Sequence, residues 1–130
     1  MENQEILKAE VGEKEIEKLK PEKVKIEKVE VVEVGDKGNK KLVCYVKYPG
    51  KEETIQISSV KYERNKKLQV TGLWINFERD EEKKDTDKLQ KGSATALFLK
   101  NVGVKTALEL EGKEVDTTED EKGYLCFKCY

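Results

Sequence analysis

Apolar residues alternate with polar ones over several short stretches of this chain, which is the pattern of half-buried β-strands. The longest such stretch covers residues 24–34, where valine and isoleucine recur but the inward phase switches twice. A switch of phase inside one strand indicates a β-bulge, and long bent strands are what a small closed barrel requires. We therefore expect a long, bulged strand in the wall of a barrel.

Further strands are predicted over residues 42–48, 54–60, 68–71 and 73–78, so that residues 23–78 form a β-meander. Pro49 and Gly50 fit a type II turn, because proline fixes φ at the second position and glycine accepts a positive φ at the third. Residues 64–66 are predicted to form a hairpin loop. This order of strands and turns favours a small antiparallel barrel.

The segments that flank the meander carry different patterns. Residues 1–22 are predicted to hold a short strand at 7–11 and a short helix at 13–20, which Pro21 ends. Residues 79–91 mix acidic and basic side chains with few apolar ones. We expect this second segment to be a solvated loop.

Residues 92–112 are predicted to be helical. Ser93 is suited to cap a helix over residues 94–100, because its hydroxyl can accept a hydrogen bond from a free amide of the first turn. Leu97 and Phe98 lie on one face of that helix, which we expect to cap one end of the barrel.

A second helical turn is predicted just before the last strands. Thr106 and Glu109 have the spacing of a capping box, in which the threonine caps the third helical residue and the glutamate reaches back to the threonine amide. Residues 113–130 then form a closing hairpin. Residues 1–130 are thus predicted to be a single, mainly β domain, an antiparallel barrel with one α-helix and a short helical turn before the C-terminal hairpin.

Charged residues make up 41% of the chain, and lysine and glutamate dominate them, with 24 Lys and 21 Glu against 6 Asp and 2 Arg. Enrichment of this kind is reported for hyperthermophile proteins, so we expect a thermophilic archaeal or viral source. No apolar stretch approaches the roughly 20 residues of a membrane helix. The first residues lack the basic and apolar regions of a signal peptide. The sequence thus predicts a cytoplasmic protein with no membrane partner.

No arrangement of residues carries a catalytic signature. The chain has no histidine, the commonest general base, and no nucleophile elbow or glycine-rich phosphate loop. Its sharpest motif is the CxxC formed by Cys126 and Cys129. A redox dithiol needs a helix N-terminus and a zinc site needs four ligands, whereas this pair lies in a predicted strand with only Cys44 to add. We therefore expect structural thiols, no cofactor, no metal site and no enzymatic activity.

Positive charge is concentrated in the centre of the chain. Residues 34–77 hold 9 bases and 4 acids, a net +5, whereas residues 1–33 (7 bases, 10 acids) and 78–130 (10 bases, 13 acids) each carry −3. The central strands also carry aromatic rings, and aromatic faces inside a lysine-lined groove are the ingredients of sequence-tolerant single-strand binding. The candidate nucleic-acid-binding residues are Trp74, Tyr45, Tyr62, Lys41, Lys47, Lys61, Arg64, Lys66 and Lys67.

Strand alternation ranks the aromatic candidates. Trp74 is out of phase with its apolar neighbours Leu73 and Ile75, so we expect it to be exposed and to serve as a platform for base stacking. Tyr45 falls on the opposite face of its strand from Cys44 and is also expected to be exposed. The alternative is that these rings cover the barrel core or its rim.

The layout of the chain resembles a known group of proteins. Strands, helix, glycine, a capped helix of the form Thr-x-x-Glu-x-x-Gly-Lys and a closing hairpin follow one another as in small OB-like replication proteins of phages and archaea that bind single-stranded DNA. The segments 91–93, 102–104, 110–115 and 122–125 also resemble uncharacterised proteins of hyperthermophilic archaea. The resemblance implies an OB-like barrel whose face binds single strands.

Two functions from different classes remain open at this point. The favoured hypothesis is a non-catalytic nucleic-acid-binding domain that prefers single strands. The alternative is a protein-interaction or assembly module, including a homodimer, because an exposed edge strand needs only its unpaired backbone to bind a partner. DNA or RNA binding at low salt discriminates between the two.

Overall fold

The computed structural model describes Leu7 and residues 18–130. Most of the strand predicted at 7–11 and of the helix predicted at 13–20 therefore lies outside the described residues. Leu7 is helical and exposed, and residues 18–20 have no regular secondary structure.

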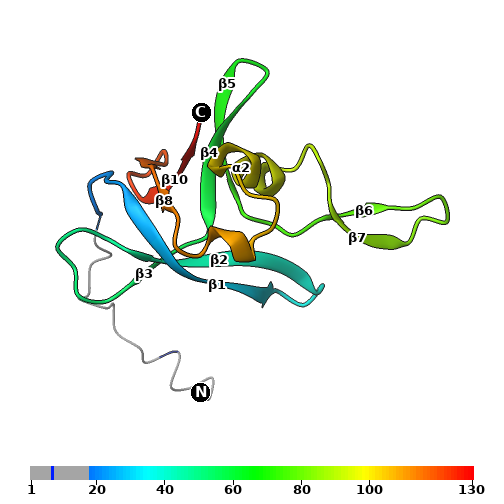
Figure 1. The fold of residues 1–130 in the computed structure, drawn as a ribbon, viewed down its shortest axis with the longest axis horizontal. Helices are drawn as coiled ribbons and strands as arrows, with labels where there is room; N and C mark the ends of the chain where they lie inside the picture. Colours follow the sequence, from blue (N-terminus) through cyan, green and yellow to red (C-terminus); the bar gives the residue numbers. More distant parts are fainter. Residues whose placement is uncertain (1–6, 8–17) are drawn as a thin grey trace.

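The described part of the chain is mainly β, as the alternating pattern predicts (Figure 1). In chain order, its elements are β1 (Val24–Val34), β2 (Asn39–Lys47), β3 (Ile55–Ile57), β4 (Ser59–Arg64), β5 (Lys67–Gly72), β6 (Phe77–Arg79), β7 (Asp85–Leu89), the helix α2 (Ala94–Val102), the 3₁₀ turn η1 (Leu108–Leu110), β8 (Glu114–Val115), β9 (Thr117–Glu119) and β10 (Leu125–Cys129).

The strand pairings run in a ring around the core. One sheet has the order β3-β2-β1-β8 and the other the order β5-β4-β10-β9. Only Ser58 separates β3 from β4, and only Asp116 separates β8 from β9. Each of these two stretches therefore starts in one sheet and continues in the other, which makes the two sheets a single barrel-like ring.

The predicted barrel was wholly antiparallel, and this is wrong at one pairing. β10 runs parallel to β4, with Phe127 opposite Val60, whereas β10 and β9 form the predicted antiparallel hairpin. A parallel pair needs a long connection between its strands. Here residues 65–124, which include α2, supply it.

The predicted bulge in the first strand is confirmed. The antiparallel register between β1 and β2 shifts between Ile26 and Lys28. Beyond the shift, Val29 lies opposite Cys44 and packs in part against the core, whereas Val31, opposite Leu42, is 51% exposed. The extra residue lets one strand keep apolar side chains inward while it bends around the core.

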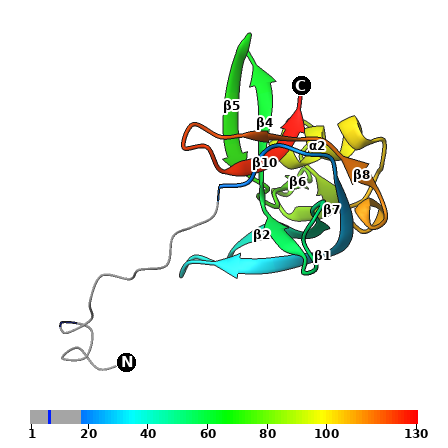
Figure 2. The ribbon, with the colours of Figure 1, turned by 90° about the vertical axis from the view of Figure 1, so that its left-hand side faces the viewer.

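Two hairpins extend from this ring (Figure 1), and the one formed by β4 and β5 also stands out in Figure 2. Asn65 and Lys66 have φ values of 52° and 64° and connect β4 to β5, which confirms the predicted hairpin loop. The segment 79–91 is mostly exposed, as predicted, but the prediction of a loop is wrong, because β6 and β7 pair there as a second hairpin. This hairpin was not predicted because the segment has too few apolar residues to show the alternation of a strand.

Two of the predicted strands are divided, because their halves have different partners. The strand predicted at 54–60 is interrupted at Ser58. The part before it pairs with β2, and the part after it pairs with β5 and β10. Of the strand predicted at 73–78, only the end belongs to a named strand, β6. Residues 73–76 instead connect β5 to β6 and run beside the start of β2, where Leu73 and Ile75 form backbone hydrogen bonds with Leu42 and Lys40.

The helix α2 closes the ring on one side. The Ser93 hydroxyl accepts a hydrogen bond from the Ala96 amide at 3.2 Å, and Gly103 ends the helix with a φ of 93°, so the predicted cap and stop are confirmed. Phe98 is fully buried and stacks on Phe127 with ring centroids 4.6 Å apart. Leu97 packs against the core only in part.

The capping box before η1 differs from its prediction in one contact. The Thr106 hydroxyl accepts from the Glu109 amide at 3.4 Å, as expected, but it donates to the Glu109 carboxylate at 3.1 Å. The glutamate thus reaches the threonine side chain instead of its amide.

Candidate nucleic-acid interface

The backbone around Trp74 is held by three neighbouring elements. Leu73 donates to Ser58 O and accepts from the Leu42 amide, each at 2.8 Å. The Thr95 hydroxyl of α2, which is buried, donates to Trp74 O at 2.7 Å. Trp74 is therefore fixed where β2, β4 and the N-terminus of α2 meet, although it belongs to no regular strand.

The Trp74 ring is half-buried, not substantially exposed as the alternation predicted. The Lys41 ammonium lies 5.2 Å from the ring centroid, a cation–π distance. Gly72 makes this arrangement possible, since a Cβ there would come within 2.7 Å of Lys41 Cε and 3.0 Å of Trp74 Nε1. Two of the predicted candidates, Trp74 and Lys41, are thus in contact.

Trp74 forms part of a polar cleft of about 260 Å³ between the β4–β5 hairpin and the start of α2. Arg64 reaches across this cleft, where its guanidinium donates to Gly92 O. The other polar side chains that line the cleft are those of Tyr62, Thr71, Asn76, Gln90, Ser93 and Thr95. Trp74 and Asn76 also border a smaller hollow of about 180 Å³ beside the start of β2.

The electrostatics of the cleft favour an anion. The first turn of α2 contains no acidic residue, and its free amides carry the positive end of the helix dipole. Arg64 and Lys41 add two formal positive charges nearby. Among the described residues that line the cleft there is no Asp or Glu.

Tyr62 cannot serve as a stacking platform, which corrects its place among the candidates. Its side chain is buried at 7% exposure in the core cluster, and its hydroxyl donates to Gln69 Oε1 at 3.3 Å. The Arg64 guanidinium carbon lies 5.3 Å from the ring centroid. The Tyr62 ring therefore helps to hold the Arg64 guanidinium at the cleft through a cation–π contact.

Tyr45 is half-buried and interacts within its own sheet. Its hydroxyl donates to Glu30 Oε2 at 3.1 Å, and the Lys28 ammonium lies 5.6 Å from its ring centroid. The bond to the carboxylate raises the pKa of the Tyr45 hydroxyl. Tyr45 and Lys41 share one face of β2, with the buried Val43 between them.

The predicted basic residues do not form one continuous track. Lys47 donates to the carbonyl of Glu52 at 3.0 Å, and Lys61 donates to that of Glu119 at 3.1 Å, so each is engaged away from the cleft. Lys66 and Lys67 are exposed at the tip of the β4–β5 hairpin, with Lys67 opposite Arg64. The structure therefore joins Trp74, Lys41 and Arg64 and leaves Lys47 and Lys61 apart.

Asn76 and Gln90, whose side chains carry amide groups, also line the cleft, although neither was among the predicted site residues. Asn76 and Gln90 are neighbours because the backbone N–H of Gln90 donates to the backbone carbonyl of Asn76 at 2.8 Å, at the base of the β6–β7 hairpin. A prediction of the β6–β7 hairpin from the sequence would have placed Asn76 and Gln90 next to each other.

The three cysteines differ in their burial and in their contact with the core. Cys44 lies in the core cluster, Cys126 is fully buried outside it, and Cys129 packs against it in part. Burial raises the pKa of Cys44 to about 12 and that of Cys126 to about 11. Over Leu7 and residues 18–130, no three Cys, Asp or Glu side chains gather as metal ligands would.

Comparison of the chain with family models, curated proteins and solved structures finds no match. Within the described part of the chain, no helix combines the length and apolar character needed to cross a bilayer.

Proposed function

We propose that this protein binds single-stranded nucleic acid, with the Trp74 cleft as its central contact, and carries out no chemistry on it. The observation that carries the proposal is the meeting of a half-buried indole ring, a guanidinium and the N-terminus of α2 in one polar cleft. Base stacking on an aromatic ring beside basic groups is the usual basis of sequence-tolerant single-strand binding.

The arrangement of strands supports an OB-like barrel as the scaffold. Five-stranded barrels of that class bind oligonucleotides on the face of their second and third strands and in the adjoining loops. In this chain, β2 and the β3–β4 stretch occupy the corresponding places in chain order. Trp74 forms an isolated β-bridge with Lys41 of β2, which supports our assignment of the cleft to the ligand-binding face of such a scaffold.

The chemistry of the cleft suggests how one nucleotide is held. A base stacks on the exposed part of Trp74, and its edge meets the amide groups of Asn76 and Gln90. The flanking phosphate lies toward Arg64 and the first turn of α2, where the helix dipole favours negative charge. The small number of cations predicts modest affinity.

The experiment that tests the proposal uses the only tryptophan of the chain as its probe. Titration with oligothymidine at low salt is expected to quench Trp74 fluorescence, with weaker binding of a duplex of equal length. A Lys122→Ala variant, altered in the exposed β9–β10 turn, serves as the control and should bind like the parent. Absence of binding to DNA and RNA strands at low salt would overturn the proposal.

One observation favours the alternative of a protein-interaction module. β5 ends its sheet, and its Leu68 and Val70 are 48% and 36% exposed. An edge strand with exposed apolar side chains is a template for pairing with another chain. A concentration-dependent dimer that Val70→Lys abolishes would support this alternative and a homodimer in particular.

A further inference from the structure

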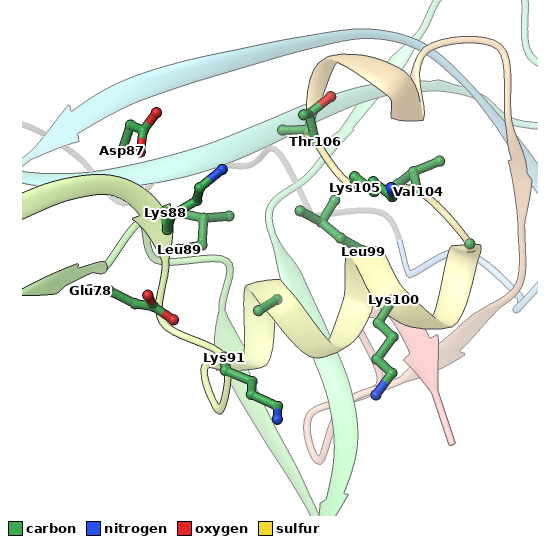
Figure 3. A pocket seen from close by; sticks show the side chains of 13 residues that line it. Glu78, Asp87, Lys88, Leu89, Lys91, Leu99, Lys100, Val104, Lys105 and Thr106 are labelled. Atoms are coloured by element: carbon green, nitrogen blue, oxygen red, sulfur yellow. The ribbon is translucent and has the colours of Figure 1, made fainter.

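A second hollow lies on another part of the surface, between the β6–β7 hairpin, α2 and the segment that leads to η1 (Figure 3). It measures about 760 Å³ and has an aliphatic floor. Leu89 of β7 and Leu99 of α2 point toward one another across it, and Val104 lies beyond Leu99. Ala96 and Ala107 complete the floor, and we call this hollow the α2 groove.

Positive charge surrounds the α2 groove. Lys88, Lys91, Lys100 and Lys105 line it, against two acidic residues, Glu78 and Asp87, so its net charge is 4 − 2 = +2. All four lysines are exposed, and within residues 18–130 none of their ammonium groups lies in an ion pair or donates a hydrogen bond. In Figure 3, Lys91 and Lys100 extend to one side of the helix, and Lys88 lies on the side of β7.

We propose that the α2 groove binds an acidic, amphipathic peptide segment of a partner protein. Charge complementarity selects an acidic partner, because the ammonium groups have no partner among the described residues of the chain itself. The aliphatic floor selects a ligand with branched apolar side chains. These side chains bury surface mainly against the partly exposed Leu89, Ala96 and Ala107, because Leu99 is itself already buried. This site is separate from the Trp74 cleft and does not depend on the proposed function.

The lining of the groove disfavours a nucleic acid strand. None of the described residues around it is aromatic, so bases have no ring on which to stack. The groove is also an open hollow instead of an enclosed cavity, whereas small-ligand sites bury most of their ligand. A peptide that lies along the groove, with apolar residues on its floor and acids toward its rim, meets both features.

The probe is a fluorescein-labelled peptide of about 12 residues, three helical turns, with leucine at positions three and four apart and glutamate elsewhere. Fluorescence anisotropy with the full chain is expected to show saturable binding that weakens with salt. Two control peptides separate the two contributions. One carries lysine in place of each glutamate and the other serine in place of each leucine, and neither should bind.

Variants of the protein then place the peptide in the groove. Lys88→Glu and Lys105→Glu should each weaken binding by about 2- to 10-fold, since charge reversal replaces an attraction with a repulsion. Lys122→Glu, the same change in the distant β9–β10 turn, should leave the affinity unchanged. Thermal unfolding of each variant verifies that it folds. Oligothymidine should not displace the peptide.

Three results would overturn the proposal. They are binding of the serine-substituted peptide with equal affinity, an equal loss in Lys122→Glu and in the groove variants, and failure of the glutamate–leucine peptide to bind at low salt. The proposed nucleic-acid function fails by a different measurement, the Trp74 titration, so the two outcomes remain distinct.

Discussion

Replacing Trp74 by alanine separates a binding platform from a purely structural ring. The indole is half-buried against Lys41, while its backbone is held by bonds that the substitution leaves intact. A stacked base contributes about 1–3 kcal/mol, so Trp74→Ala should weaken oligothymidine binding by about 5- to 150-fold.

The cost to stability should be smaller than that of a core deletion. Truncating a fully buried large aromatic costs about 3–5 kcal/mol. Because part of the indole already faces solvent, we expect about half of that cost, a loss of about 1.5–2.5 kcal/mol in the free energy of unfolding. This loss leaves the protein folded at room temperature.

Binding is best measured by the anisotropy of a labelled strand, because the variant lacks the fluorescent residue. Trp74→Phe is the matched control and should retain most of the affinity, since it keeps an aromatic face. Urea unfolding gives the stability of each variant. Unchanged affinity in Trp74→Ala together with a loss above about 3 kcal/mol would show that Trp74 is only structural and refute the reasoning.

Three further predictions concern the cleft, the cap of α2 and the buried cysteines. Arg64→Ala should reduce the magnitude of the slope of log affinity against log salt by about 0.7, the value of one phosphate contact with a single strand. Ser93→Ala should lower the free energy of unfolding by about 1 kcal/mol, because the cap on α2 is lost, and a denaturation curve measures it. Cys44 and Cys126, whose raised pKa values keep them as thiols at pH 8, should react with a disulfide reagent only as fast as the chain unfolds; rapid labelling of either one in folded protein would contradict this.

Several local features followed from the sequence because neighbouring residues alone determine them. Ser93 accepts the Ala96 amide within one turn, and Gly103 takes the left-handed φ that ends α2. Gly50 has a φ of 85° and the Lys51 amide donates to Tyr48 O, as the predicted type II turn requires. Strand alternation likewise identified β1 and its bulge.

The candidate site was predicted only in part, since its members meet through long-range contacts. Lys41, Arg64 and Trp74 were all candidates. The cleft that Arg64 and Trp74 share, and the contact of Lys41 with the Trp74 ring, depend on residues 73–76 running beside the start of β2. Tyr62 shares a face of β4 with the buried Val60, so its ring lies in the core. Alternation assigns two faces to a strand and does not say which one is buried.

The sequence by itself determined the mainly β character, the turns, the caps and the basic centre of the chain, because propensity, capping and charge act over a few neighbouring residues. Only the tertiary structure decided the ring of pairings, the parallel contact of β10 with β4 and the β6–β7 hairpin. These depend on which distant segments bury apolar surface together. Both the Trp74 cleft and the α2 groove lie between such segments, and they exist only once those segments have packed.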